Sequence, residues 1–404
     1  MPHSSPGQSA RPLLTIFIIC AIDVLGFGVI VPLVPYMAVR FGAAPWVITA
    51  ILGSYSLCQL IAAPFWGRLS DRYGRRPILI VSMAGACLSY LVLGFAPGLA
   101  WLLLSRMLSG FMAGNISAAM AYAADVSLPE HRARALGTVG AAIAVGFMLG
   151  PALGGVLVGN NVRSANFLLP ASVSAVLSVL AMLLVTLLLR ESRGVAERLA
   201  SRARALPSTA LRTLAARPAL RWLVLAGVLV TFSQSTLESI VALWGLTRFG
   251  IGPRTIGLML FGLAAIAVAM QGGLVRVLAP RFGEQRLAIA GIAAYVCGLA
   301  ITGVAPTLPI AIGGLALCGF GSGAFSPSVS ALASRQADAG NRGVVMGTYQ
   351  SGTSLARVLG PFSAGFIFGR FGAGAPFLVG ALVTLQALWC MLAAQRAGRQ
   401  EVAQ

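Results

Sequence analysis

The 404-residue sequence contains no lysine and few acids: ten aspartates and glutamates stand against 29 basic residues, all of them arginine. Only 10% of the residues are charged, whereas 58% are hydrophobic. So few charges cannot cover the surface of a water-soluble protein of this size, but they suffice for one that crosses a membrane many times. The composition therefore excludes a soluble globular protein and indicates a polytopic membrane protein in contact with a lipid bilayer.

Residues for metal or redox chemistry are also scarce. The two histidines, His3 and His131, lie in polar segments, and all six cysteines fall inside apolar runs without a short pair spacing. We expect the cysteines to be buried apolar residues that form neither a disulfide nor a metal site. An intramembrane enzyme would need metal ligands or a nucleophile–base pair at membrane depth. We therefore expect no enzymatic activity, no metal and no cofactor.

The net charge of +19 comes from arginines spread over short segments between apolar runs. A nucleic-acid-binding surface would gather such charges on one face, with aromatic residues between them. We therefore expect no nucleic-acid partner.

Twelve apolar runs of roughly 20 residues, each long enough to cross about 30 Å of hydrocarbon, recur along the chain. They are predicted at residues 13–36, 47–66, 77–96, 100–124, 135–158, 166–189, 220–246, 255–278, 287–305, 308–330, 345–366 and 375–394. The first run follows a short polar segment without a small-residue cleavage site, so we expect it to be a span and not a removed signal peptide. With both ends in the cytoplasm, and with Arg221 and Arg276 at the edges of their runs counted there, 22 of the 29 arginines lie on that side, five lie outside and Arg106 and Arg357 lie inside spans. This asymmetry follows the positive-inside rule and predicts cytoplasmic termini.

The two halves of the chain resemble each other. Gly137-Thr138, followed by Gly150-Pro151, recurs 210 residues later as Gly347-Thr348, followed by Gly360-Pro361. We predict a six-helix bundle over residues 1–189, a basic cytoplasmic linker over 190–219 and a second six-helix bundle over 220–404. Repeated halves of this kind predict a substrate site near the middle of the membrane, between the halves, with access that alternates between the two sides.

Residues 67–76, between the second and third runs, read Gly-x-x-x-Asp-Arg-x-Gly-Arg-Arg. This pattern resembles the signature loop of the major facilitator superfamily. The resemblance implies an all-α fold of twelve transmembrane helices in two pseudo-symmetric bundles, and a gating latch that contains the acid. Asp125, at the end of the fourth run, either joins a charge relay with this loop or is a simple helix-end charge. The predicted gating residues are Gly67, Asp71, Arg72, Gly74, Arg75, Arg76 and Asp125. The second half has Pro280 where the first has the acid, so we expect an asymmetric latch.

The fifth run carries a series of glycines around a proline. The series resembles the antiporter motif of the drug:proton efflux branch of that superfamily, which implies export. The residues are Gly140, Gly146, Gly150, Pro151, Gly154 and Gly155. Such a helix packs closely on a neighbour and bends at its proline.

Asp23, Arg106 and Glu238 are ionisable residues that fall well inside predicted spans. Because a charge is costly there, each is a candidate functional residue. The segment from Asp23 resembles the first helix of tetracycline-efflux proteins, and Arg106 resembles a fourth-helix residue linked to proton coupling. We predict that Asp23 and Glu238 bind protons and that Arg106 tunes one of them. The alternative is that Asp23 only hydrogen-bonds a kinked helix.

The sequence lacks three ionisable residues, two acids and one histidine, that tetracycline-efflux proteins often carry within their spans. Ser89 stands near their third-helix acid, and neither their eighth-helix histidine nor their ninth-helix aspartate is found. We predict a monomeric, proton-coupled exporter of tetracycline-like or other amphipathic drugs in a bacterial inner membrane. The alternative is a proton-coupled exporter of a metabolite such as a sugar, amino acid or siderophore. Candidates to line the substrate cavity, which are equally plausible as lipid-facing or packing residues, are Tyr36, Tyr55, Phe232, Gln234, Trp244 and Arg357.

Overall fold

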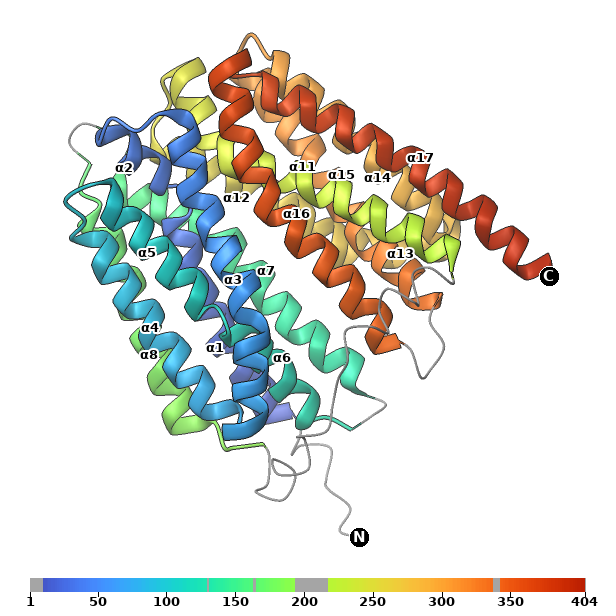
Figure 1. The fold of residues 1–404 in the computed structure, drawn as a ribbon, viewed down its shortest axis with the longest axis horizontal. Helices are drawn as coiled ribbons and strands as arrows, with labels where there is room; N and C mark the ends of the chain where they lie inside the picture. The colour runs from blue at the N-terminus through green and yellow to red at the C-terminus, as the bar shows by residue number, and fades with distance from the viewer. Residues whose placement is uncertain (1–9, 129–130, 163–164, 193–216, 337–341, 404) are drawn as a thin grey trace. The chain divides into compact units, whose positions relative to one another are not determined.

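The computed structural model describes residues 10–128, 131–162, 165–192, 217–336 and 342–403, which are largely helical and contain no β-strand (Figure 1). Most of the predicted linker, residues 193–216, lies outside the described residues. The helices are α1 (Ala10–Ile30), α2 (Val34–Arg40), α3 (Pro45–Tyr73), α4 (Arg75–Gly94), α5 (Leu99–Met112), α6 (Asn115–Asp125), α7 (Arg132–Val158), α8 (Leu168–Leu188), α11 (Pro218–Phe249), α12 (Pro253–Ala269), the π-helical turn η3 (Met270–Leu274), α13 (Val275–Phe282), α14 (Glu284–Val304), α15 (Leu308–Arg335), α16 (Arg342–Phe371) and α17 (Ala375–Ala403).

Within the described residues, eleven helical segments are long and apolar enough to cross a membrane. Three of them are interrupted helices: α1 with α2, α5 with α6, and α12 with η3 and α13. The remaining predicted span corresponds to α16, which has 30 residues but is not among the eleven. Polar residues along α16, among them Gln350, Ser354 and Arg357, account for its lower hydropathy. The all-α fold expected from the sequence is confirmed.

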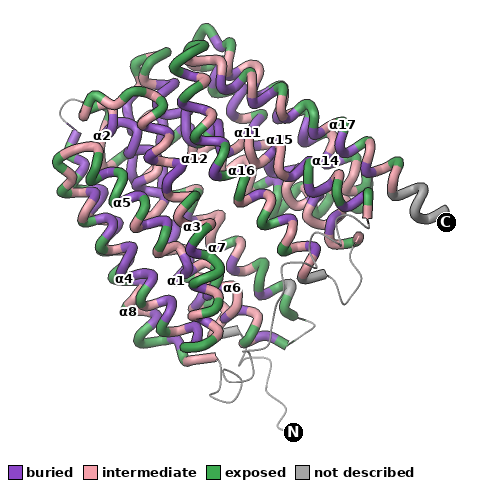
Figure 2. Tube along the Cα trace, in the orientation of Figure 1, coloured by how far each residue is buried: buried purple, intermediate pink, exposed green. Residues whose placement is uncertain are grey.

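The helices carry apolar side chains on the outside of the molecule, which is the reverse of a soluble protein. On α8, Val176 is 65% exposed and Leu187 is 77% exposed, and Leu180 and Leu183 fall between them at helical spacing. The opposite face buries Ser174 and Ser178. Figure 2 shows exposed and buried positions alternating along the same helices. An exposed surface this apolar is suited to contact with lipid.

The chain divides into two compact units. Unit 1 contains Met1–Ala43, Ser54–Arg204 and Gly252–Phe261, and unit 2 contains Ala44–Gly53, Ala205–Ile251 and Gly262–Gln404. The start of α3 therefore groups with unit 2, and the start of α12 groups with unit 1.

Each unit has its own hydrophobic core. The core of unit 1 includes Ile16, Leu79, Tyr122, Val139 and Val185, all at most 3% exposed. The core of unit 2 includes Leu220, Ile292, Phe325, Val345 and Met391, all at most 2% exposed.

Candidate functional site

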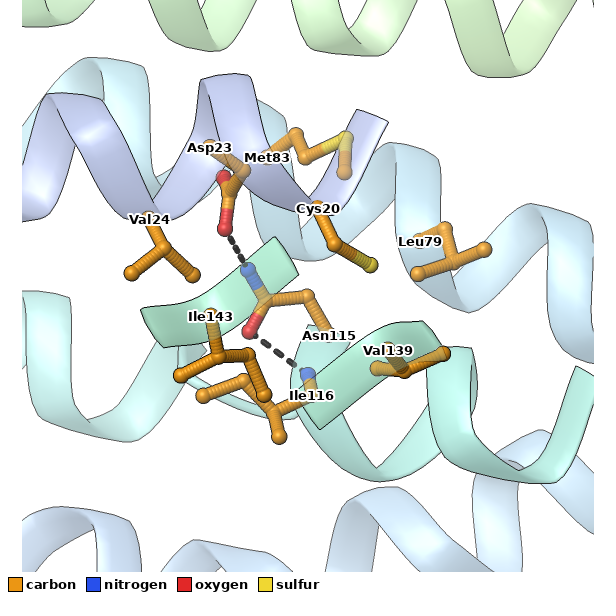
Figure 3. Close-up of a pocket in the computed structure, with 9 residues that line it drawn as sticks. All are labelled: Cys20, Asp23, Val24, Leu79, Met83, Asn115, Ile116, Val139 and Ile143. Carbon is orange, nitrogen blue, oxygen red and sulfur yellow. Dashed lines mark hydrogen bonds between the residues drawn. The ribbon is translucent and has the colours of Figure 1, made fainter. Parts of the chain in front are cut away.

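Asp23 lies on α1, is only 7% exposed and lines a small cavity in unit 1 (Figure 3). The cavity volume is about 10 Å³, near the lower limit of about 10–15 Å³ that one water molecule requires. Helices α1, α4, α6 and α7 supply its walls, which are lined by Cys20, Asp23, Val24, Leu79, Met83, Asn115, Ile116, Val139 and Ile143. The carboxyl group is therefore enclosed, with space beside it for about one water molecule.

Asn115 is the polar partner of Asp23. Its Nδ2 donates a hydrogen bond to the Asp23 carboxyl group, and its Oδ1 accepts one from the Ile116 backbone N–H at 2.8 Å (Figure 3). Because the oxygen of the amide is already held, the amide presents its N–H side to the carboxyl group. Asn115 is the first residue of α6, directly after the break that separates α5 from α6. A side chain on Gly114, within this break, would meet the Trp66 ring.

Arg106 on α5 is 1% exposed. Its guanidinium donates to Ser105 Oγ at 3.3 Å, while its Nε has no hydrogen-bond partner in the described part of the chain. Among the described residues, Arg106 and Asp23 form no ion pair. Tyr90 instead interacts electrostatically with both of them and is hydrogen-bonded to Ser109. Any influence of Arg106 on Asp23 therefore acts across a distance, with Tyr90 coupled to both groups.

The glycine series on α7 brings this helix against α1. A Cβ atom on Gly146 would lie 2.7 Å from Val24 Cβ, and one on Gly150 would lie 2.6 Å from Gly28 Cα. Gly154 faces Val29 in the same way, and Gly155 faces Pro253 at the start of α12. Gly146, Gly150 and Gly154 allow α7 to approach the backbone that carries Asp23 more closely than any side chain would permit.

Gly140 belongs to the same sequence series but not to this contact. A Cβ atom at Gly140 would have nothing within 4 Å. Pro151 lies within α7, whose helix continues to Val158.

The segment predicted to be a loop at residues 67–76 is almost entirely helical. Helix α3 continues to Tyr73 and α4 begins at Arg75, so Gly74 alone breaks the chain, with φ of 104°. The loop prediction was wrong because the polar residues here are compatible with a helix that extends beyond the apolar run. Only Gly74 needs the conformational freedom of glycine. A Cβ atom at Gly67 would meet nothing within 4 Å.

Arg75 is the centre of an ionic network and is only 5% exposed. Its guanidinium donates to Asp71 Oδ1 at 2.8 Å, to Ser70 Oγ at 3.0 Å and to Asp125 Oδ2 at 3.1 Å. Asp125 also accepts a hydrogen bond from the Ser192 hydroxyl at 3.3 Å. The structure therefore brings the two acids, Asp71 and Asp125, to one arginine. Arg72 does not join this group and lies over the Tyr73 ring, 5.3 Å from its centroid.

Glu191, just beyond α8, caps the N-terminus of α4. Its Oε1 accepts a hydrogen bond from the Arg75 backbone N–H at 2.9 Å, and its Oε2 accepts one from the Arg76 N–H at 3.1 Å. The first N–H groups of a helix lack partners within the helix, and its N-terminus favours negative charge. Glu191 therefore satisfies two of these donors and ties the end of α8 to the start of α4. A side chain at Gly74 would collide with this carboxylate.

The corresponding segment of unit 2 repeats the single-glycine break without the acidic cluster. Gly283, with φ of 84°, separates α13 from α14. Glu284, the next residue, forms an ion pair with Arg335 at 2.8 Å. Pro280 lies inside α13 at the position of the missing acid. The two breaks thus share a backbone turn but differ in their ionic partners.

Glu238 and Arg357 lie close to each other in unit 2. Helix α11 carries Glu238, which is exposed, and interacts electrostatically with Arg357 and by a side-chain hydrogen bond with Gln234. Arg357, on α16, is also exposed. No ion pair of 4 Å or less joins these two residues in the described structure. Glu238 is therefore not a buried carboxyl group like Asp23.

The remaining candidate cavity residues divide by environment. Tyr36 is 1% exposed, and Trp244, also 1% exposed, packs edge-on against Phe249 and Phe377, so neither faces an accessible surface. Tyr55 is partly exposed, and its ring centroid lies 4.6 Å from that of Phe27.

Phe232 is partly exposed on α11.

The structure shows no group of three or more potential metal ligands within the described residues. Cys20, Cys318 and Cys390 are buried as expected, whereas Cys297 is exposed.

A model of the Major Facilitator Superfamily matches residues 16–347 and residues 249–402. The chain belongs to this superfamily. It is 30% identical to the class C tetracycline resistance protein of Escherichia coli, over 94% of this chain and 96% of that protein. It is 29% identical to the class G protein of Vibrio anguillarum, over 91% of this chain and 94% of that protein. The crystal structure of the human organic anion transporter MFSD10 matches with a TM-score of 0.72 and 26% identity, over 96% of this chain and all of that chain.

This member of the Major Facilitator Superfamily is a multi-pass membrane protein and a transporter of small molecules, not an enzyme. The resemblance found in its signature segment and its glycine series is therefore confirmed at the level of the superfamily and of tetracycline-efflux relatives.

Two residues of this transporter that the structure connects to the predicted ones were not predicted from the sequence. Asn115 is a lone amide within an apolar run, and Glu191 is an acid two residues after the end of the sixth run. Polar residues at a run's interior or end are visible signals, but their partners, Asp23 and the start of α4, are far away in sequence.

Replacement of Glu191 by glutamine is expected to loosen the first turn of α4 in this transporter. The amide retains one acceptor oxygen but loses the negative charge, so one of the two hydrogen bonds and the interaction with the helix terminus are lost. The free energy of opening the first turn of α4 should fall by about 1 kcal/mol. The Arg75 and Arg76 amides should therefore exchange hydrogen roughly five times faster. Hydrogen–deuterium exchange with peptide resolution measures this.

Glu284→Gln is the matched control, because Glu284 follows the equivalent glycine but pairs with the Arg335 side chain. It should leave exchange in α4 unchanged. Unchanged exchange in Glu191→Gln would contradict the capping role.

Proposed function

We propose that the chain exports tetracycline-like or other amphipathic drugs in exchange for protons, by alternating access in a bacterial inner membrane. Asp23 and Glu238 are the proton-binding residues of this proposal, and Arg106 acts on Asp23 at a distance. The observation that carries it is the enclosed Asp23 carboxyl group with its amide donor, Asn115. A carboxyl group shielded from bulk solvent can hold a proton on one side of the transport cycle and release it on the other when the cavity opens.

Two further observations support export of drugs. The glycines that resemble the antiporter motif lie against the helix that carries Asp23, so a movement of α7 would act directly on its cavity. The relatives with 29% and 30% identity are tetracycline resistance proteins.

We propose the following arrangement of the chain in the membrane. Residues 1–189 and 220–404 form two bundles that expose the substrate to the two sides in turn, and residues 190–219 link them in the cytoplasm. Both termini are cytoplasmic because the arginine-rich segments are then inside. The network of Asp71, Arg75 and Asp125 is placed on the cytoplasmic side by the same rule, where it serves as the predicted gate. The protein works as a monomer.

A second candidate is a proton-coupled exporter of a metabolite. It is favoured by the match to a structure whose protein is an organic anion transporter. The two candidates share the coupling residues and differ in the cargo.

Expression in a drug-efflux-deficient bacterium tests the proposal. We expect a higher minimum inhibitory concentration of tetracycline or of other amphipathic drugs, and a lower drug content of the cells that a protonophore restores. No change in susceptibility to any such drug, with the protein present in the membrane, would favour the metabolite exporter. Drug extrusion that persists with a protonophore would contradict proton coupling.

A further inference from the structure

Helix α16 has two different exposed faces. Leu355, Leu359, Phe362 and Phe366 follow one another at spacings of four, three and four residues and are 40–66% exposed, which makes them an exposed apolar stripe. Gln350, Ser354 and Arg357 follow at spacings of four and three on another face, and Gln350 and Arg357 are exposed. A membrane helix with a separate polar face needs water or protein groups on that side.

Arg357 is too deep for its charge to reach an end of the helix. It lies fifteen residues after Arg342 and fourteen before Phe371, which is about 22 Å and about 21 Å at a rise of about 1.5 Å per residue. A snorkelling side chain extends its charge to the interface only from near a helix end. An exposed guanidinium at this depth therefore needs water or a polar partner beside it.

Glu238 lies on the adjoining helix at a similar depth. It is eleven residues before the end of α11, or about 17 Å, and shares a helix face with Gln234 and Thr231 at spacings of four and three. It is the exposed member of a stretch in which the residues from Ser235 to Gly245 are otherwise buried.

Hydrogen bonds from side-chain hydroxyls to backbone carbonyls hold the two helices together next to these charges. Ser235 Oγ donates to the Arg357 carbonyl at 3.1 Å, and Thr236 Oγ1 donates to the Gly360 carbonyl at 3.4 Å. A Cβ atom on Gly360 would lie 2.9 Å from the Phe232 carbonyl oxygen. The absence of a side chain at Gly360 thus allows the close approach that places α11 beside Arg357.

The two charges interact but do not close into an ion pair in the described structure, and both remain exposed. An exposed carboxylate and an exposed guanidinium at one wall of unit 2 match a ligand with charges of both signs.

We propose that this wall of unit 2 is a substrate subsite for amphipathic zwitterions, in which Arg357 binds the anionic group and Glu238 binds the cationic group. This proposal rests on the proposed function, since it names the substrate class of the same transporter. Glu238 then carries either a proton or the ammonium group of the substrate, so proton binding displaces the substrate from it. This competition has the sign that exchange of drug for proton requires.

Three probes with one aromatic body test the subsite: norfloxacin, which is a zwitterion, its methyl ester, which is a cation, and its N-acetyl derivative, which is an anion. Binding is measured by equilibrium dialysis with the purified full-length protein in lipid nanodiscs, without a proton gradient. We expect norfloxacin to bind about tenfold more tightly than either analogue, equivalent to about 1.4 kcal/mol for each charge.

Each substitution should remove one preference and keep the other. Arg357→Gln should make norfloxacin and its methyl ester bind equally while the preference over the N-acetyl derivative remains. Glu238→Gln should do the reverse. Because each variant retains one preference, misfolding cannot produce this crossed pattern. Arg370→Gln, on the same helix near its end, is the control and should keep both preferences.

Equal binding of the three probes to the unmodified protein, or no binding of any of them, would overturn the subsite. So would an Arg357→Gln variant that still discriminates against the ester. Proton-driven uptake into vesicles tests the proposed function separately. The crossed pattern without such uptake would support the subsite and contradict the proton exchange. Proton-driven uptake without the crossed pattern would support the proton exchange and contradict the subsite.

Discussion

Asp23→Asn is expected to abolish drug transport driven by a proton gradient. The substitution keeps the size of the side chain and an oxygen that accepts the Asn115 hydrogen bond, but it removes the group that binds and releases the proton. Uptake of drug into inverted membrane vesicles energised with a pH gradient should therefore fall to the level of vesicles without the protein. The thermal unfolding of the purified variant should stay close to that of the unmodified protein, because the buried amide remains hydrogen-bonded.

Cys20→Ala is the matched control for this prediction. Cys20 lines the same cavity as Asp23, so its replacement enlarges the cavity without changing the carboxyl group. It should retain most of the proton-driven uptake. Proton-driven uptake that survives in Asp23→Asn would reject Asp23 as a coupling residue and would favour its alternative role as a hydrogen-bonding residue in an interrupted helix.

Gly150→Ala is expected to cause the second large loss. A single methyl group at this position would lie 2.6 Å from Gly28 Cα on α1, a distance that only a backbone shift can relieve. Overpacking of this kind costs about 1–3 kcal/mol. We expect a lower apparent melting temperature in a fluorescence-detected unfolding experiment. We also expect a loss of drug transport, because the shift displaces the helix that carries Asp23.

Gly140→Ala tests whether the losses come from close packing at Gly150 or from the loss of any glycine in this helix. It makes the same chemical change in the same helix and the same sequence series, at a position with open space. Stability and transport should be nearly unchanged, since alanine also favours the helix more than glycine does. Equal losses in Gly140→Ala and Gly150→Ala would contradict the packing explanation.

Much of the fold is predictable from the sequence because a membrane imposes simple rules. A span must be helical and about 20 residues long, so the apolar runs predict the helices to within several residues. The same rule weakens for α16, where polar residues lower the hydropathy of a helix of full length.

Helix ends beyond the apolar runs follow different physics. Outside the hydrocarbon, a polar segment is free to remain helical, and α3 does so as far as Tyr73. Hydropathy gives no signal for that extension, so the ten-residue signature segment was predicted to be a loop. Of the two glycines in this segment, only Gly74 has a positive φ and so needs to be glycine for its backbone conformation.

The candidate site was predictable in its charges but not in their partners. Asp23 and Glu238 stand out because ionisable residues are rare within spans. Their environments differ, however: Asp23 is enclosed with Asn115, whereas Glu238 is exposed near Arg357. Which side of a helix faces a cavity, and which distant residue lies opposite, depends on packing between helices. A single sequence does not contain that information.

The π-helical turn η3 changes which residues share a side of the span from Pro253 to Phe282. A π turn accommodates an additional residue, so the chain beyond it is rotated by about 100° from the course of an uninterrupted 3.6-residue helix. A helical wheel drawn across the whole segment would therefore assign Arg276 and its neighbours in α13 to an incorrect azimuth. Cysteine-labelling scans of this span should accordingly be analysed in two registers, one before Met270 and one after Leu274.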